Sequence, residues 1–420
     1  MPTSHRVRIR DLLLMVASSI TIIGTTAIAA SLPKMSDAFA STPHGHYLVK
    51  VSLTLPALTA GLFAVPMGQI VDRWGRKPLF LSSLVLYGGA GCASFVLHSL
   101  YGILVSRLLL GVAVSAVATC ATTLIADYTS KDQIGRAMGR QSLFMALGNV
   151  VFVFTGGLLA TQGWRWPFLL YAAGFVLIPG VVVLITEPHR LSTRAEPELP
   201  VESAPLELGT ITFTYVLLFV NMIIYFMVPV YLPFYLSSFS GENSVKAGAL
   251  LSVVGVAWAV SSTQYKRLAR RLPYDRITVL TFALLGAAYV LLGTASVYPV
   301  VVVALILTGV GLGSTIPNLN AWMLAVTPPT VKGRVIGTRV STTFLGQFIS
   351  PVVTAPLTAA LGIGHSYVIA GLVMLGISAG TAVWLTTRTR TRPTATPTPA
   401  PTPAPGDPRL VARLPGETTD

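Results

Sequence analysis

The stretch Gly68-Gln-Ile-Val-Asp72-Arg73-Trp-Gly75-Arg76-Lys77 places four charged residues in a short turn between two long apolar segments. The flanking segments, residues 47–70 and 78–97, are each long enough to cross a bilayer, which takes about 20 helical residues. The rest of the chain repeats this alternation of an apolar segment and a short polar turn. We therefore expect an all-α integral membrane protein.

The composition supports this expectation and excludes other classes. Of 420 residues, 53% are apolar and 10% are charged, and the mean hydropathy is +0.70. A soluble domain carries about 25% charged residues. A soluble enzyme, a disordered regulator and a nucleic-acid-binding protein are therefore excluded, despite the net charge of +14. Cys92 and Cys120 both lie in apolar segments, so we expect no disulfide framework, no metal site and no cofactor.

Twelve apolar segments are predicted to span the membrane. The first follows a basic stretch and resembles a signal peptide, but it is long enough to span, and eleven more segments follow it. The expected spans are residues 11–32, 47–70, 78–97, 101–126, 141–161, 166–186, 210–235, 246–264, 277–297, 299–326, 335–361 and 365–387.

The basic residues predict the orientation. If the N-terminus is cytoplasmic, 24 of the 29 Lys and Arg residues fall in cytoplasmic loops or in the C-terminal tail. Such loops carry an excess of Lys and Arg. We therefore expect a multi-pass protein of the inner (plasma) membrane with both termini in the cytoplasm.

The chain divides into two halves. Residues 187–209 are polar and rich in Pro and Glu, which predicts a cytoplasmic linker between six-helix bundles at 1–186 and 210–387. Residues 388–420 are rich in Thr, Pro and Ala and are expected to form a disordered cytoplasmic tail. The halves also repeat: residues 68–77 match 262–271, and 147–149 match 345–347. Duplicated halves predict a site between them at mid-membrane and alternating access by rocking.

The opening stretch carries every fixed position of the pattern G-x-x-x-D-R-x-G-R-[RK], on which the chain is identified as a member of the major facilitator superfamily. The resemblance implies two pseudo-symmetric six-helix bundles. Glycines permit close helix approach and a tight turn. We expect Asp72 to latch onto the positive N-terminal end of span eleven, and Arg76 to pair with an acid or a helix C-terminus. The alternative is that these charges only set the topology, which we favour for Lys77. The candidate gate residues are Gly68, Asp72, Arg73, Gly75, Arg76 and Lys77.

Other stretches resemble the twelve-helix drug- and metabolite-exporting branch. SRLLLGVAVSAVAT, with Arg107 and Gly111, is similar to its intramembrane arginine signature, and FLGQFISPVVTAPL resembles multidrug and siderophore exporters of the bacillibactin-exporter type. A cation inside a span is costly unless it is paired or hydrated. Arg107 should therefore face a cavity or carbonyl oxygens, unless it snorkels to the headgroups. Arg107 and Asp37 are the candidates for proton coupling.

Two departures from this branch bear on the substrate. The Gly-Pro hinge usual in span five is absent, and only Gly156 and Gly157 remain of that pattern. No acidic residue falls in the middle of a predicted span. Because a lipophilic cation is best held by a buried carboxylate, we expect a neutral or anionic amphipathic small molecule.

Polar and aromatic residues of the spans are candidates for substrate contact. Pairs four residues apart, such as Asn221 with Tyr225 and Asn318 with Trp322, share one helix face. The alternative is that such residues tie helices together. The cavity candidates are Asn149, Asn221, Tyr225, Asn318, Trp322 and Gln347.

The leading hypothesis is a secondary active exporter of drug-like compounds or secondary metabolites that exchanges them for protons. An importer or uniporter of a sugar or organic solute is the alternative, although the chain lacks a PESPR-like stretch after span six. A membrane receptor or an intramembrane enzyme is less well supported, since no acidic pair, His/Cys cluster or nucleophile elbow is present. The ATP-binding pattern G-x-x-x-x-G-K-[ST] is also absent, so the energy must come from a gradient.

Overall fold

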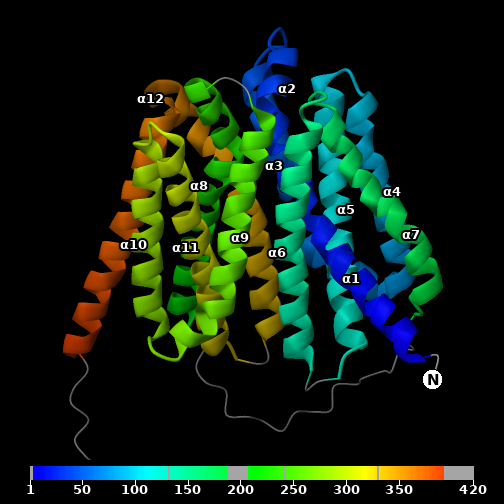
Figure 1. The fold of residues 1–420 in the computed structure, drawn as a ribbon. Coiled ribbons are helices and arrows are strands. Elements are labelled where there is room, and N and C mark those ends of the chain that lie inside the picture. Colours follow the sequence, from blue (N-terminus) through cyan, green and yellow to red (C-terminus); the bar gives the residue numbers. More distant parts are fainter. Residues whose placement is uncertain (1–2, 131–132, 188–206, 241–242, 329–330, 392–420) are drawn as a thin grey trace, which may run out of the picture.

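The structure is a computed structural model that describes residues 3–130, 133–187, 207–240, 243–328 and 331–391. Within these residues every regular element is a helix (Figure 1). Eleven of them are long and apolar enough to cross a membrane. The last, Arg334–Trp384, bends at Gly362, where φ is +80°, so that it supplies two crossings. The helices therefore make the twelve expected crossings.

The first six crossings depart from the predicted spans in two places. The first span is broken, because α1 ends before the Leu32-Pro33 step and a short 3₁₀ turn precedes α2. The sixth span opens as the 3₁₀ helix η2 before it becomes α7. The elements are α1 (Thr3–Thr26), η1 (Ala29–Ser31), α2 (Leu32–Ala38), α3 (Gly45–Trp74), α4 (Arg76–Val96), α5 (Leu100–Asp127), α6 (Ile134–Leu159), η2 (Trp166–Ala172) and α7 (Ala173–Leu184).

In the second half, α8, α9 and α12 are longer than the hydropathy pattern predicts, whereas α10 and α11 are not. Its elements are α8 (Leu208–Ser240), α9 (Ser244–Ala269), α10 (Tyr274–Gly293), α11 (Tyr298–Ala325) and α12 (Lys332–Thr391). Helix α12 continues to Thr391, so the first residues of the predicted tail are helical. Most of the predicted linker, residues 188–206, and the remainder of the tail, residues 392–420, lie outside the described residues.

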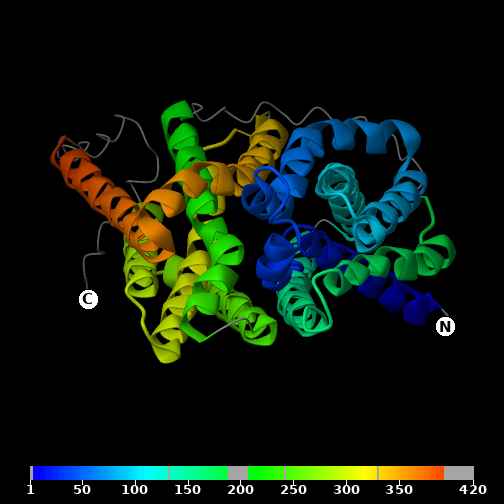
Figure 2. The same cartoon turned by 90° about the horizontal axis from the view of Figure 1, so that it is seen from above.

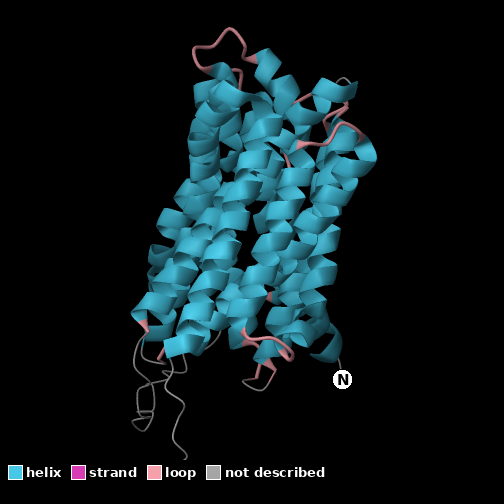
Figure 3. Cartoon of the chain, turned by 90° about the vertical axis from the view of Figure 1, so that its left-hand side faces the viewer, coloured by secondary structure: helices cyan, strands magenta, loops and turns pink. Residues whose placement is uncertain are grey.

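The helices form two bundles that stand side by side. Seen along the helix axes, elements α1–α7 lie on one side and α8–α12 on the other (Figure 2). The crossings run roughly parallel to one another (Figure 3). We call the end where α1 begins, α3 meets α4 and α9 meets α10 the basic end, which is the lower end in Figure 1, and the other the opposite end.

The two bundles repeat the same packing. A Cβ added to Gly111 of α5 would lie 2.1 Å from the Pro56 carbonyl oxygen of α3. A Cβ added to Gly309 of α11 would lie 2.5 Å from the Val254 carbonyl oxygen of α9. Such contacts require glycine, since a side chain would collide with backbone. These contacts pair residues of the two halves that are 198 positions apart in the sequence. The predicted match of residues 68–77 with 262–271 uses an offset of 194, so it is shifted by about one helical turn from the structural alignment.

Candidate functional site

Arg107 is enclosed within the first bundle. Its side chain on α5 is 0% exposed. The Nη1 atom donates a hydrogen bond to the Tyr171 hydroxyl at 2.8 Å, and this hydroxyl donates to the Ile23 carbonyl oxygen of α1 at 3.1 Å. The guanidinium carbon also lies 4.5 Å from the centre of the Phe168 ring and 4.8 Å from that of Tyr171. Arg107 thus contacts a tyrosine hydroxyl and two aromatic rings, and a carbonyl oxygen only indirectly; its enclosed side chain does not snorkel out of the bundle.

The charge of Arg107 is incompletely compensated. Its Nε and Nη2 atoms are buried and have no hydrogen-bond partner within the described part of the chain. Neither ion pair found among the described residues includes this arginine. A buried charge without a counterion is strongly unfavourable, and contact with aromatic rings recovers only part of the cost. Two guanidinium nitrogens therefore have hydrogen-bonding capacity that the described residues leave unused.

A pair of tyrosines beside Arg107 recurs in the second bundle. The Tyr87 hydroxyl donates to the Ile20 carbonyl oxygen of α1 at 2.6 Å, and its ring meets that of Tyr171 edge to face. In the second bundle, Tyr289 donates to the Ile224 carbonyl oxygen of α8 at 2.8 Å, and Tyr367 donates to that of Met227 at 3.2 Å.

Arginine is absent from the second copy of this arrangement. Matching Gly111 with Gly309, whose backbone contacts correspond, places Leu305 opposite Arg107 in the repeat. Leu305 is likewise fully buried. In the second bundle the tyrosine pair is therefore accompanied by a leucine at the position that matches Arg107.

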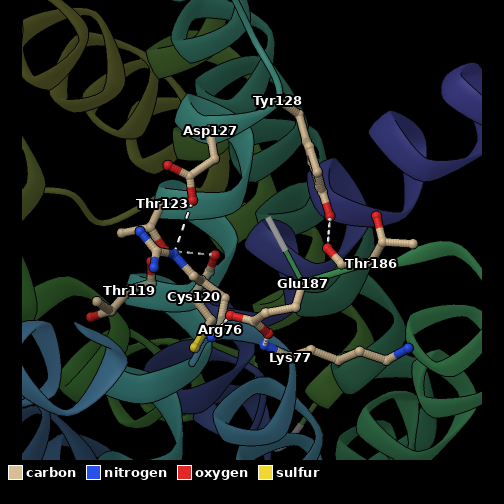
Figure 4. A network of polar contacts seen from close by, with 9 residues as sticks. All are labelled: Arg76, Lys77, Thr119, Cys120, Thr123, Asp127, Tyr128, Thr186 and Glu187. Atoms are coloured by element: carbon tan, nitrogen blue, oxygen red, sulfur yellow. Dashed lines mark hydrogen bonds and ion pairs between the residues drawn. The ribbon is translucent and has the colours of Figure 1, made fainter. Parts of the chain in front are cut away.

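A second polar network lies at the basic end (Figure 4). Arg76, at the start of α4, forms an ion pair with Asp127, the last residue of α5, with Nε and Oδ2 3.0 Å apart. The Glu187 carboxylate accepts hydrogen bonds from the backbone N–H groups of Arg76 at 2.7 Å and Lys77 at 2.8 Å. A carboxylate here complements the positive end of the α4 dipole. Glu187 follows α7, so the network joins α4, α5 and the end of α7.

The turn at Gly75 makes this network possible. Its φ of +91° lies in a region that favours glycine. A Cβ added there would lie 2.9 Å from Glu187 Oε1. Lys77 also donates from Nζ to the Val182 carbonyl oxygen at 2.8 Å. Neither Glu187 nor Asp127 was expected from the sequence as a site residue. The acid in ITEPHR directly after the sixth span is the signal that could have found Glu187.

The remaining gate candidates have different surroundings. The side chain of Asp72 lies outside the described part of the structure. Gly68 does not serve a close helix approach, because a Cβ added there meets nothing within 4 Å; that expectation is wrong. Arg73 is exposed.

Helices α3 and α12 meet across the two bundles. The Ser341 hydroxyl of α12 donates to the Gly61 carbonyl oxygen of α3 at 2.9 Å, and α12 begins at Lys332. The two helices run antiparallel, so the start of α12 approaches the end of α3 that carries Asp72.

The bundles also meet at the opposite end. There α6 and α9 pack through glycine: a Cβ on Gly157 would lie 2.8 Å from the Ser244 carbonyl oxygen and 2.9 Å from Gly248 Cα. Gly157 thus gives close contact between the bundles without the Gly-Pro hinge, whereas Gly156 approaches the Ala27 backbone within the first bundle. The Lys50 ammonium of α3 lies 5.0 Å from the ring centre of Tyr231 on α8. Asp37 is exposed on α2 at this end, and the structure shows no contact between it and Arg107.

The cavity candidates separate into partnered and unpartnered amides. Asn318 donates from Nδ2 to the Tyr274 carbonyl oxygen at 2.8 Å and to Thr278 at 2.9 Å, which ties α11 to α10. Asn149 accepts a hydrogen bond from Thr26 at 3.2 Å. Asn221 is 0% exposed, and neither atom of its amide has a partner within the described residues. The Oε1 atom of Gln347 is also buried and has no hydrogen-bond partner within the described residues.

The two aromatic candidates take part in ring contacts. Tyr225 meets Trp258 of α9 edge to face, with ring centres 5.8 Å apart. Trp322 meets Phe213 of α8 in the same manner at 6.0 Å. Unlike the Asn221 amide, both side chains therefore have defined partners in this conformation.

Two similar bundles with twelve crossings and polar groups enclosed inside them define a class of membrane protein, the multi-span transporters. A family model described as Major Facilitator Superfamily matches residues 14–298 and 247–415. The chain belongs to this family, whose members transport small molecules across membranes.

Characterised relatives are similar over most of their length. The multi-drug resistance efflux pump PmrA of Streptococcus pneumoniae is 25% identical over 323 residues, which cover 74% of this chain and 79% of the relative. The class G tetracycline resistance protein of Vibrio anguillarum is 27% identical over 342 residues, covering 77% and 84%.

Solved structures confirm the fold. A D-xylose-proton symporter superposes with a TM-score of 0.75 at 14% identity, covering 89% of this chain and 97% of the symporter. An inward-facing, unoccupied bacterial homologue of the human lysosomal transporter Spinster gives 0.72 at 15% identity, covering 94% and 100%. At such identities the likeness concerns the fold alone.

Proposed function

We propose that the protein is a secondary active exporter of drug-like compounds or secondary metabolites, siderophores among them, and that it exchanges its cargo for protons. The similarity to PmrA and to the tetracycline resistance protein over about three quarters of the chain supports export of drug-like molecules. The basic end faces the cytoplasm in this proposal, in line with the excess of Lys and Arg there.

One observation carries the coupling mechanism: a fully buried arginine occupies a place that leucine fills in the other bundle. Since the second bundle keeps a tyrosine pair and has a buried leucine, Leu305, at the matching position, we infer that the Arg107 charge is not needed to build the bundle. The charge is nevertheless enclosed with two unpartnered nitrogens, at a cost to stability. Because the buried charge lowers stability and is not required for packing, its presence supports a functional role for Arg107.

The geometry suggests how Arg107 acts. Its hydrogen bond to Tyr171, which in turn bonds to the Ile23 carbonyl oxygen, links the charge to α1, one of the helices that line the cavity in this fold. When the bundles rock, the unpartnered nitrogens bind an anionic group, and the positive charge disfavours a proton nearby. Asp37, exposed at the opposite end, is the second candidate for proton coupling.

Substrate contact is proposed chiefly for the unpartnered amides. Asn221 and Gln347 have donor or acceptor capacity that the described residues leave unused, so a polar group of the cargo can satisfy it. Tyr225 adds aromatic surface beside Asn221. Neutral amides and an aromatic ring suit a neutral or anionic amphipathic molecule. Asn318 is hydrogen-bonded to α10, so it is a weaker candidate for substrate contact.

The gate is proposed to close the basic end. The start of α12 lies beside the end of α3, so the Asp72 carboxylate can interact with the positive dipole of α12. The ion pair of Arg76 with Asp127 and the hydrogen bonds of Glu187 fix the turn that follows. Rocking of the bundles must break the α3–α12 contact and leave the network within the first bundle intact.

Substrate-induced proton release tests the proposal, measured in inside-out vesicles over dyes, antibiotics and siderophores. The key variant is Arg107→Leu, which copies the second bundle and should fold to normal abundance. It should abolish proton release, whereas the control Arg136→Leu, which removes an exposed charge, should not. Proton-coupled transport retained by Arg107→Leu would refute the role of this arginine. A transport rate of the unmodified protein that does not change with the pH gradient would refute proton antiport.

A further inference from the structure

A groove of about 820 Å³ lies between α8 and the last part of α12, in a region that no transport step described above uses. From α8 it is lined by Phe213, Val216 and Val220, and from α12 by Ile377, Gly380 and Trp384. The Phe213 and Trp384 rings stack with their centres 5.9 Å apart. Apart from Glu207, Thr210 and Thr381, the lining consists of apolar side chains and glycine, which is the surface expected of a site for a hydrocarbon chain.

The groove runs along the first part of the candidate span Leu208–Ser237, over a depth close to that of one leaflet. Helix α8 begins at Leu208, at the basic end, so that Val220 lies about 18 Å along the helix at 1.5 Å per residue. Half of the hydrocarbon core is about 15 Å thick. Val216 is 53% exposed, so the groove is open to its surroundings. A Cβ added at Gly380 meets nothing within 4 Å, which leaves that wall smooth.

The mouth of the groove carries a carboxylate. Glu207 immediately precedes α8 and lines the groove together with Thr210, whose hydroxyl donates to Glu207 Oε2 at 2.9 Å. The side chain of Glu207 is exposed. It lies where a helix meets the headgroup region, so it can accept hydrogen bonds from an ammonium group and repels an anionic headgroup.

We propose that this groove binds a phospholipid with a primary ammonium headgroup, such as phosphatidylethanolamine. One acyl chain lies against Phe213, Val216 and Ile377, and the ammonium group binds Glu207. A lipophilic amine would match the same chemistry. A groove open to the bilayer meets lipid in great excess, however, so occupancy by mass action favours lipid. The assignment goes beyond the proposed transport function and does not depend on it.

Quenching by brominated lipids tests the proposal. The full-length protein is reconstituted with phosphatidylethanolamine, phosphatidylcholine or phosphatidylglycerol carrying brominated acyl chains. The contribution of Trp384 is obtained by difference from the Trp384→Phe variant, because the chain contains six tryptophans. Trp384 should be quenched at about three- to fivefold lower mole fraction of phosphatidylethanolamine than of phosphatidylglycerol, a preference expected of one exposed charge contact.

Two substitutions test binding of the acyl chain and binding of the headgroup separately. Gly380→Leu fills the groove and should at least halve the Trp384 quenching, whereas Gly89→Leu, at another glycine with open space around it, should leave it unchanged. Glu207→Gln should remove the headgroup preference while quenching persists. Equal quenching in Gly380→Leu and the unmodified protein overturns the site. No headgroup preference, or displacement of the brominated lipid by low concentrations of dodecylamine, overturns phosphatidylethanolamine as the occupant.

Discussion

Replacing Gly157 with alanine should hold the transporter open at its opposite end. The glycine lies near the end of α6, where the two bundles touch through α9. An added Cβ would lie 2.8 Å from the Ser244 carbonyl oxygen and 2.9 Å from Gly248 Cα, whereas ordinary contact begins at 3.4 Å. Both neighbours are backbone atoms, so no side chain can rotate away. The helices must therefore separate by about half an ångström.

The size of the effect follows from the cost of overpacking. Forcing one extra carbon into a close-packed contact costs about 1–3 kcal/mol. Since the contact joins the two bundles, this cost falls on the state in which the opposite end is closed. The population of that state should therefore fall by about 5- to 150-fold relative to the open state. Neither bundle is packed internally by this contact, so the amount of folded protein should not change.

Distances between spin labels measure this shift. Labels at Thr161 and Asn243, both exposed at the opposite end, should give a longer distance in Gly157→Ala than in the unmodified protein, and the maximal transport rate should fall. Gly89→Ala is the control, because a Cβ added there meets nothing within 4 Å. An unchanged distance distribution in Gly157→Ala would refute the view that the α6–α9 contact belongs to the closed state.

Other predictions concern the two ends of the molecule. Gly75→Ala forces alanine to a φ of +91°, costs about 1–2 kcal/mol, and should lower the melting temperature measured by scanning fluorimetry in detergent. Asp127→Asn removes a partly exposed ion pair, so stability should change by less than about 1 kcal/mol. Its maximal transport rate should nevertheless fall, and an unchanged rate counts against the network. Asp72→Asn should slow turnover more than it weakens substrate binding; equal effects on both contradict the latch. Lys50→Met removes an ammonium group 5.0 Å from an aromatic ring of α8, worth about 0.5–1 kcal/mol. A two- to fivefold shift towards opening should appear in the same spin-label distances, and no shift excludes this contact from closure.

Much of the fold was predictable because the bilayer restricts the choice of structure. A helix that satisfies its own backbone hydrogen bonds is the form an apolar segment must take in lipid, and each of the twelve predicted spans corresponds to a helical crossing. The errors lie where local chemistry interrupts this rule. The first span is broken: α1 ends at Thr26, and Pro33 lies in the first turn of the separate helix α2, where the N–H that proline lacks has no partner within the helix. The long α12 joins two predicted spans, because Gly362 bends without a loop.

The site was less predictable, because side-chain environment depends on partners from distant helices. Asn221 and Asn318 look alike in the sequence, each followed by an aromatic residue four positions later. Asn318 is hydrogen-bonded to α10, whose Tyr274 and Thr278 lie about 40 residues earlier. Asn221 is unpartnered within the described residues. No pattern within either helix distinguishes a tie between helices from an unused amide.

Internal duplication provides a way to separate structural from functional residues in this chain. Each bundle keeps two tyrosines that donate to carbonyl oxygens of its first helix, and each keeps a glycine where two helices touch. What both copies retain is what a six-helix bundle needs for packing. What one copy alone has, as with Arg107 opposite Leu305, is not explained by packing. The asymmetric charge therefore stands out against the symmetric framework, even though a single arginine in a span is ambiguous when the sequence is considered one helix at a time.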